Sequence, residues 1–206
     1  PKHVQEALLS AEDIRFYSHP GVDIQGILAA AWADITRGKT RGGSTLSQQL
    51  MKITHLTNEQ TLTRKLQDAR LALELERVYT KDEILEMYLN TMYFGNGAYG
   101  IEAAAQSYFG KPAKELTLAE GALLIGVLKG PGIYAPHLNM EKSVQRRNLI
   151  LGLMHDYGFI TEQQMEKAKD EEVKLKLQPR TSANYGFYID AAENEAIELT
   201  GISRED

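Results

Sequence analysis

The apolar residues of this 206-residue chain recur at helical spacing along most of its length. Apolar positions three and four residues apart are typical of one face of an amphipathic helix. The pattern stops near residue 11, returns at 23–37 and 57–79, and continues through the second half of the chain. There it predicts helices at 81–90, 99–109, 117–129, 144–157 and 185–199, with another after residue 161. The sequence therefore predicts a mostly α-helical fold.

Several of these helices begin at sequences that cap helix N-termini. Three pairs have the spacing of a capping box: Thr80 and Glu83, Thr117 and Glu120, and Thr161 and Gln164. Ser44 follows Gly42 and Gly43 and is a good N-cap for a helix that runs through Lys52. These signals predict where the helices start.

Two of the predicted helices are rich in apolar residues. The 117–129 helix is apolar on nearly every side, so it should be the buried centre of the fold. The 23–37 helix has one apolar face, which includes Ile27, Leu28 and Trp32. The local pattern favours packing of this face on the core, and contact with a membrane surface is the alternative.

Glycine marks the turns between helices. Residues 95–100 match the Gly-x-Gly-x-x-Gly string of dinucleotide sites, but they follow a helix pattern rather than a strand. A glycine-rich turn is the better account of this stretch. Residues 129–136 are predicted to form a break and a loop, and the alternation at 171–180 favours an extended segment.

Composition excludes several functional classes. The formal charge of -5 argues against a general nucleic-acid binder. No cysteine is present, which excludes thiol catalysis, and the five histidines have no metal-binding spacing. The longest apolar runs, 27–33 and 122–128, are far shorter than the roughly 20 residues that span a bilayer. An anionic substrate would therefore need a local basic cluster.

Candidate chemistry begins where the first helix pattern stops. Glu12 and Asp13 stand there, followed by Phe16, His19 and Gly21. Polar groups at a helix end, with glycine to turn the chain, suit the lining of a cleft. A solvated acidic pair is the simpler alternative.

A helix start rich in hydrogen-bond donors comes next. The free N–H groups near Ser44 can hold an anion. Gln48, Gln49 and Lys52 lie within about one turn and add amide donors and a positive charge. A capped surface helix is the alternative.

A basic pair lies on the following helix. Arg64 and Lys65 are within one turn of Asp68. On local grounds, the four-residue spacing of Arg64 and Asp68 is explained by an exposed ion pair. Such a pair contributes little to stability.

The order of these stretches resembles that of a known enzyme family. The order is Glu12-Asp13-x-x-Phe16-x-x-His19-x-Gly21, then residues 42–49, then Arg64-Lys65-x-x-Asp68, then residues 81–90. It closely resembles the peptidoglycan glycosyltransferases, the family 51 glycosyltransferases of class A penicillin-binding proteins and monofunctional cell-wall polymerases. The resemblance covers about residues 6–136.

This resemblance implies a mostly α-helical, lysozyme-like fold and a reaction at a membrane. The expected fold has a larger globular lobe and a small membrane-facing lobe at about residues 23–43, with Ile27, Leu28 and Trp32 in contact with the membrane. The family polymerises lipid II. It transfers the growing glycan from undecaprenyl pyrophosphate to the 4-hydroxyl of the next lipid II, with inversion.

The resemblance also implies roles for individual residues. Glu12 occupies the position of the general base, and Lys52, Arg64 and Lys65 occupy positions near the leaving pyrophosphate. A divalent cation, Mg²⁺ or Mn²⁺, is expected to bind with the substrate rather than at a metal site of the protein. Asp68 is the second catalytic acid, where the family usually has a Glu that reaches about 1.5 Å further. Substrate-binding positions fall on Asp13, Phe16, His19, Gly43, Ser44, Thr45, Gln48 and Gln49.

The resemblance further implies what surrounds this chain. Residues 1–180 are expected to form the glycosyltransferase domain, and residues 181–206 to start a linker toward a transpeptidase domain. An upstream transmembrane segment is expected to anchor the protein at the outer face of the cytoplasmic membrane. The expected partners are lipid II, the growing glycan strand and the membrane, and no nucleic acid.

Two other functions stay open at the level of sequence. A lysozyme-like lytic enzyme would use Glu12 as a general acid, but it would leave the basic cluster of Lys52, Arg64 and Lys65 without a pyrophosphate to stabilise. A catalytically weakened, membrane-bound scaffold would keep the fold, and Asp68 is the one feature that favours it.

Overall fold

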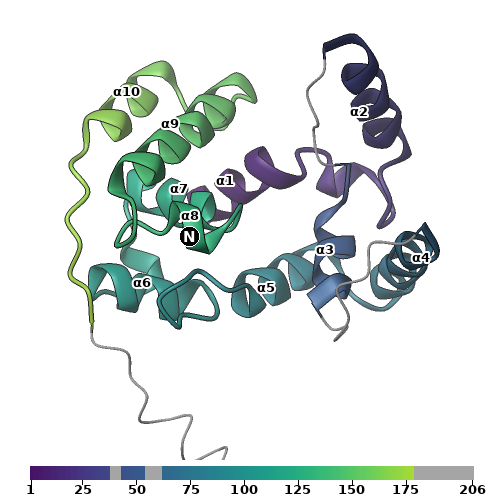
Figure 1. The fold of residues 1–206 in the computed structure, drawn as a ribbon, viewed down its shortest axis with the longest axis horizontal. Coiled ribbons are helices and arrows are strands. Elements are labelled where there is room, and N and C mark those ends of the chain that lie inside the picture. The colour runs from purple at the N-terminus through teal and green to yellow at the C-terminus, as the bar shows by residue number, and fades with distance from the viewer. Residues whose placement is uncertain (38–42, 54–61, 179–206) are drawn as a thin grey trace, which may run out of the picture.

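The computed structural model describes residues 1–37, 43–53 and 62–178, which are mostly helical (Figure 1). The prediction of a mostly α-helical fold is confirmed. The α-helices are α1 Lys2–Glu12, α2 Ile24–Arg37, α3 Leu46–Ile53, α4 Leu62–Val78, α5 Lys81–Thr91, α6 Ile101–Phe109, α7 Leu118–Val127, α8 Pro131–Tyr134, α9 Met140–Asp156 and α10 Glu162–Asp170. Short 3-10 turns lie at Phe16–Ser18 and Ala113–Glu115.

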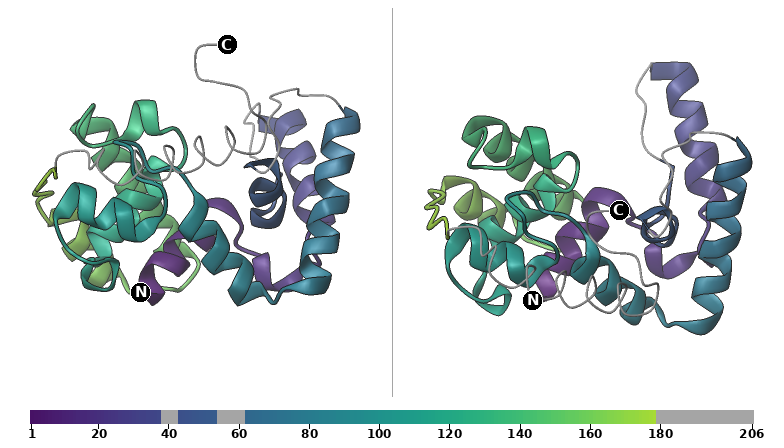
Figure 2. Two further views of the ribbon diagram at one scale, coloured as in Figure 1. Left: turned by 90° about the horizontal axis from the view of Figure 1, so that it is seen from below. Right: turned by 60° about the horizontal axis from the view of Figure 1, so that its bottom comes forward.

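The helices form a larger group and a smaller group, joined by α1 and α5 (Figures 1 and 2). In the larger group, α7 packs against α1 and α9, and α10 packs on α9. In the smaller group, α3 packs against α4 and also contacts α5. The C-terminal end of α1 and the N-terminal end of α5 therefore lie where the two groups meet.

The centre of the larger group is α7, as its composition predicts. Leu123, Leu124 and Ile125 are at most 1% exposed. Burying a side chain of this size contributes about 1.5–3 kcal/mol. The core continues through Leu8 of α1 and Tyr88 of α5, so the same packing fixes the two helices that lead to the smaller group.

All three predicted capping boxes are present. The side chains of Thr80, Thr117 and Thr161 each accept a hydrogen bond from the backbone N–H three residues later. The side chain of that later residue accepts the backbone N–H of the threonine. These predictions succeed because a capping box is a local arrangement that four residues fix by themselves.

Other helix boundaries differ from the prediction. Helix α9 begins four residues early, because Asn139 caps it by accepting from the N–H of Lys142. The predicted loop after residue 129 contains the short helix α8, with Pro131 at its first position, where no N–H is needed. The predicted helix at 185–199 and residues 57–61 of the predicted 57–79 helix lie outside the described residues.

The glycine-rich stretch is the turn that its sequence predicts. Phe94 N–H donates to the carbonyl of Ala98 at 2.9 Å, which closes a tight loop between α5 and α6. Gly100 has φ 85°, and a Cβ there would lie 2.7 Å from the carbonyl oxygen of Asn90. Glycine is therefore required by both conformation and space.

Helix α2 is the main departure from the local prediction, which placed its apolar face on the core. Leu28 is 66% exposed and Trp32 is 71% exposed, and Ile24 and Ile27 are exposed as well. Core packing of this face is therefore wrong for these side chains. None of the helices in the described part of the chain is long and apolar enough to cross a membrane.

Candidate active site

Glu12 is the last residue of α1, and its carboxylate is partly exposed where three helices meet. Gln49 of α3 donates from Nε2 to Glu12 Oε2 at 3.1 Å. Tyr88 of α5 donates from its hydroxyl to Gln49 Oε1 at 2.9 Å. A carboxylate at a helix end is thus held by an amide that is itself held from the core.

Tyr88, at the inner end of this series of hydrogen bonds, stays protonated. Tyr88 is 0% exposed, and burial together with the negative charge of Glu12 raises its pKa well above the ordinary value. Its hydroxyl therefore remains a donor at any pH where the protein works.

Asp13 differs sharply from Glu12. Its side chain is buried, and both of its carboxylate oxygens lie 3.0 Å from His19 Nε2. One of them also accepts the backbone N–H of Leu46 at 3.0 Å. Asp13 therefore ties the turn after α1 to the first residue of α3.

A second set of bonds fixes the same turn from α5. Lys81 Nζ donates to the carbonyl of His19 at 2.6 Å and lies 4.3 Å from the ring centroid of Phe16. It also pairs with Glu76 of α4 at 2.7 Å, and the hydroxyl of Ser47 donates to that same carboxylate. Lys81 of α5 therefore binds the turn and α4 directly, and α3 joins the same cluster through the bond between Ser47 and Glu76.

The cap of α3 is Thr45, which corrects the prediction of Ser44. The N–H of Gln48 donates to Thr45 Oγ1 at 3.2 Å, and Gln48 Oε1 accepts from Thr45 N at 2.9 Å. Thr45 Oγ1 also donates to the carbonyl of Gly21 at 2.6 Å. A local capping box with Gln48 and a long-range bond to Gly21 therefore both favour Thr45 as the cap.

The remaining predicted site residues line the outer side of these helices. Lys52, in the last turn of α3, and Lys65 of α4 are exposed, and Asp68 of α4 is partly buried. Ser44 is exposed and Gly43 partly so. The backbone of Arg64 lies in α4, and its side chain is outside the described residues.

The structure thus separates the predicted substrate-binding residues into two sets. Asp13, Phe16, His19 and Thr45 are buried, and the polar groups of Asp13 and Thr45 are engaged within the protein. The more accessible set consists of Gly43, Ser44, Gln48 and Gln49. Direct contact of either set with a substrate stays a prediction.

Two residues with clear roles in the site lie in the fourth stretch of the family resemblance, residues 81–90, and no site role was expected for either. Lys81 is the first residue of α5 and Tyr88 one of its apolar positions. A lysine at a helix N-terminus opposes the helix dipole, and this mismatch is the signal that could have marked Lys81 as bound elsewhere. Helical periodicity does not distinguish Tyr88 from a core tyrosine, and only its place in the stretch at residues 81–90 marks it.

An ion pair missed by the sequence analysis fixes the start of α2. Arg15 donates to both oxygens of Asp23, at 2.7 and 2.8 Å, and Asp23 accepts the N–H of Gly26 at 2.8 Å. Asp23 is partly desolvated, which opposes ionisation, but the bonds from Gly26 and Arg15 outweigh this and lower its pKa. The capped helix is thereby anchored to the turn after α1.

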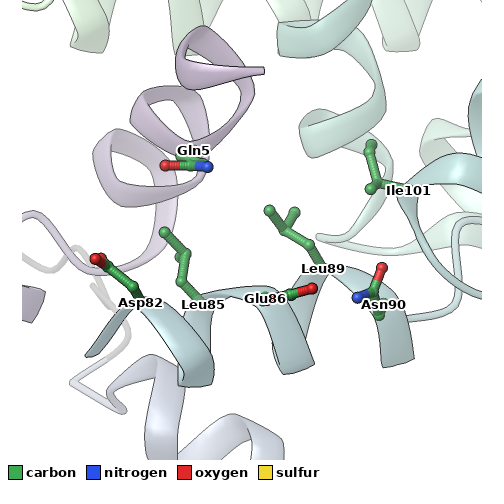
Figure 3. Close-up of a pocket in the computed structure, with 7 residues that line it drawn as sticks. All are labelled: Gln5, Asp82, Leu85, Glu86, Leu89, Asn90 and Ile101. Carbon is green, nitrogen blue, oxygen red and sulfur yellow. The ribbon is translucent and has the colours of Figure 1, made fainter. Parts of the chain in front are cut away.

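A separate concavity of about 470 Å³ lies between α1 and α5 (Figure 3). Its lining includes Leu85 and Leu89 with Asp82 and Glu86 of α5, and Gln5 of α1. Glu12 is not part of this lining, so the chemistry described above lies elsewhere. Within the described residues, no group of three His, Cys, Asp or Glu side chains could hold a metal ion.

Comparisons with known proteins agree on one family. The family described as Transglycosylase matches residues 1–155. Penicillin-binding protein 1F of Bacillus subtilis is 42% identical over 100% of this chain and 29% of its own length. Penicillin-binding protein 1A of Pseudomonas aeruginosa is 45% identical over 98% of this chain and 24% of its own length.

The solved structures include penicillin-binding protein 1A from Haemophilus influenzae, with a TM-score of 0.47 and 26% identity over 77% of this chain and 20% of that one. The chain spans less than a third of the length of the two curated relatives described above. Its family follows from the match over residues 1–155 and from the identity to those two proteins. The chain belongs to the transglycosylase family, and it is similar to these two penicillin-binding proteins over nearly all of its length.

Proposed function

We propose that this chain polymerises lipid II into glycan strands, with Glu12 as the general base. The observation that carries the proposal is the partly exposed Glu12 carboxylate at the end of α1, oriented by the amide of Gln49 at 3.1 Å. The family match supports a glycosyltransferase and does not favour the lytic enzyme or the inactive scaffold.

In the proposed reaction, the carboxylate of Glu12 removes the proton of the acceptor 4-hydroxyl as that oxygen attacks the donor's anomeric carbon. A sugar hydroxyl is too weakly acidic to attack unaided, so a positioned base is needed. The new C–O bond forms as the bond to undecaprenyl pyrophosphate breaks on the opposite face. The configuration therefore inverts, and no covalent glycosyl-enzyme is formed.

The leaving pyrophosphate gathers negative charge. We assign the stabilisation of this charge to the basic residues. The exposed Lys52 and Lys65 lie on α3 and α4, and Arg64 belongs to the same helix as Lys65. A divalent cation bound with the substrate would neutralise further charge, and Asp68 is the carboxylate we assign to it. Mg²⁺ commonly binds through substrate phosphates and one or two carboxylates, so a pyrophosphate-bound ion needs no cluster of protein ligands.

The substrate-binding residues divide by accessibility. We assign direct contacts with the sugar and phosphate groups to Ser44 and Gln48, near the start of α3. Gln49 is also partly accessible, but its amide bonds to Glu12 and Tyr88, so we assign it to orienting the base. The buried residues Asp13 and His19 would act by holding that helix start in place. This division follows from which side chains are accessible and which are buried.

We also propose that α2 contacts the membrane. Leu28, Trp32 and Ile27 form an exposed apolar surface, and an amphipathic helix with such a surface binds at a lipid interface. Residues 23–37, the described part of the expected lobe before residue 38, would then face the membrane, at the outer face of the cytoplasmic membrane where lipid II is presented. A transpeptidase domain in the same polypeptide would use the glycan strands that the glycosyltransferase domain makes.

The test is incubation of labelled lipid II with this chain, beside Asp68→Glu and Asp68→Asn. We expect a long polymer that lysozyme digests, a loss of activity in Asp68→Asn, and activity retained or raised in Asp68→Glu. Cleavage of added glycan without polymer formation would replace the proposal with the lytic enzyme. Binding of lipid II without turnover, with polymer made only by Asp68→Glu, would establish the weakened scaffold.

A further inference from the structure

We infer that Tyr88 is a positioning residue for the general base, acting through the side-chain amide of Gln49. Its hydroxyl donates to Oε1 of this amide and so anchors the group whose Nε2 donates to the carboxylate of Glu12. The hydrogen bond between Tyr88 and Gln49 is seen in the structure, whereas its effect on the rate of polymerisation rests on the proposed function.

The orientation of the amide follows from its two neighbours. A glutamine amide has a donor side and an acceptor side, and rotation by half a turn exchanges them. With Nε2 toward Glu12, the amide donates to a carboxylate oxygen at 3.1 Å and accepts from Tyr88 at 2.9 Å. The reversed amide would place its oxygen against the carboxylate, which is repulsive.

Tyr88 is suited to hold this orientation because it is rigid and remains a donor. It lies within the core cluster and is 0% exposed, so packing fixes its ring. Burial and the charge of Glu12 raise its pKa, which keeps the hydroxyl protonated. Glu12 lies at a partly exposed helix end, and its carboxylate is thereby held in place by a residue of the protein core.

Loss of the Tyr88 hydroxyl should affect turnover rather than substrate affinity. A phenylalanine leaves the ring in place and frees the Gln49 amide to rotate, so the base spends less time aimed at the acceptor. One hydrogen bond corresponds to a change of about two- to tenfold. We therefore expect kcat for lipid II to fall by that factor with KM nearly unchanged, because the buried ring does not reach the substrate.

Tyr108 provides a matched control within the same chain. It is also 0% exposed, and its hydroxyl donates to the carbonyl of Phe94 at 3.0 Å, a bond that does not involve Glu12 or Gln49. Tyr108→Phe should cost similar stability and leave kcat unchanged. In a Gln49→Ala background, Tyr88→Phe should have no further effect on kcat.

These comparisons can overturn the inference. Equal losses of kcat in Tyr88→Phe and Tyr108→Phe would mean that only stability was changed. A Tyr88→Phe effect that persists in the Gln49→Ala background would mean that Tyr88 does not act through the amide.

An activity-free measurement separates this inference from the proposed function. The side-chain amide signals of Gln49 in a ¹⁵N NMR spectrum can be assigned by their absence in Gln49→Ala. We expect them to move toward the values of a free glutamine in Tyr88→Phe but not in Tyr108→Phe. Unchanged signals in Tyr88→Phe would overturn the inference, whereas a parent chain that makes no polymer would count against the proposed function alone.

Discussion

Glu12 and Asp13 are adjacent acids in the sequence, yet they belong to two different regions of the molecule. Asp13 is 8% exposed and bonds to His19 and to the N–H of Leu46. Glu12 is partly exposed and receives a hydrogen bond from Gln49. The buried carboxylate of Asp13 has its partners within the protein, while Glu12 is partly exposed and can be reached by a substrate.

Burial and hydrogen bonding thus separate two adjacent acids of one motif: Asp13 holds the fold together, and Glu12 is available for chemistry. A buried carboxylate with several partners is costly to disturb, because the partners lose their bonds as well. An accessible carboxylate with one partner can be changed with little effect on folding. Substitutions in the two regions should therefore affect different measurements.

The largest effect on stability is expected for Asp13→Ala. Loss of this carboxylate leaves His19 and the N–H of Leu46 without their partner, so the free energy of unfolding should fall by about 2–5 kcal/mol. Urea unfolding measures this, with Glu12→Gln as the control, which should change the value by at most about 0.5 kcal/mol. Similar losses in both variants would remove the distinction between the two regions.

A smaller effect, on binding rather than folding, is expected for α2. Leu28→Ser should weaken association with vesicles of phosphatidylcholine and phosphatidylglycerol by about tenfold, because an apolar side chain no longer enters the lipid. The unfolding free energy should not change, since Leu28 is 66% exposed. Leu149→Ser, at a 50% exposed leucine of α9, is the control and should bind like the parent. Equal binding by both variants would contradict a membrane role for α2.

The smallest effect concerns the exposed edge of the turn that Asp13 holds. Tyr17 donates to Asp82 at 2.7 Å, and its pKa is raised to about 12 by desolvation and by this bond. The unfolded tyrosine loses its proton near its ordinary pKa of 10.0, so the stability from this group is present below that pH and is lost by about pH 12. Unfolding free energies at pH 9 and 11.5 should therefore differ less in Tyr17→Phe than in the parent. An unchanged difference would show that Tyr17 contributes nothing to the turn.

Local sequence signals predicted much of the fold but only part of the site. Helical periodicity located most helices, and the capping boxes at Thr80, Thr117 and Thr161 were exact because each involves only four residues. The choice of Thr45 over Ser44 also had a local signal, because Thr45 and Gln48 have capping-box spacing and make its two reciprocal bonds. The bond from Thr45 to the carbonyl of Gly21, 24 residues away, leaves no trace in local propensity.

The surroundings of α2 and Tyr88 could not be predicted for a related reason. Periodicity shows that one face of α2 is apolar but does not say whether the core, solvent or lipid covers it. Tyr88 is at a normal core position of α5, and its bond to Gln49 connects residues 39 apart in sequence. Motif order identified the candidate base, and three-dimensional packing was needed to show what orients it.

The role of Glu12 as the base of a glycosyltransferase is tested by the polymerisation of labelled lipid II by Glu12→Gln and by the parent. We expect the parent to make lysozyme-sensitive glycan and the variant to lose activity by at least about 100-fold, the scale of a lost general base. The unfolding free energy of the two proteins should agree within about 0.5 kcal/mol. Polymer formation by Glu12→Gln at the parent's rate would contradict the account.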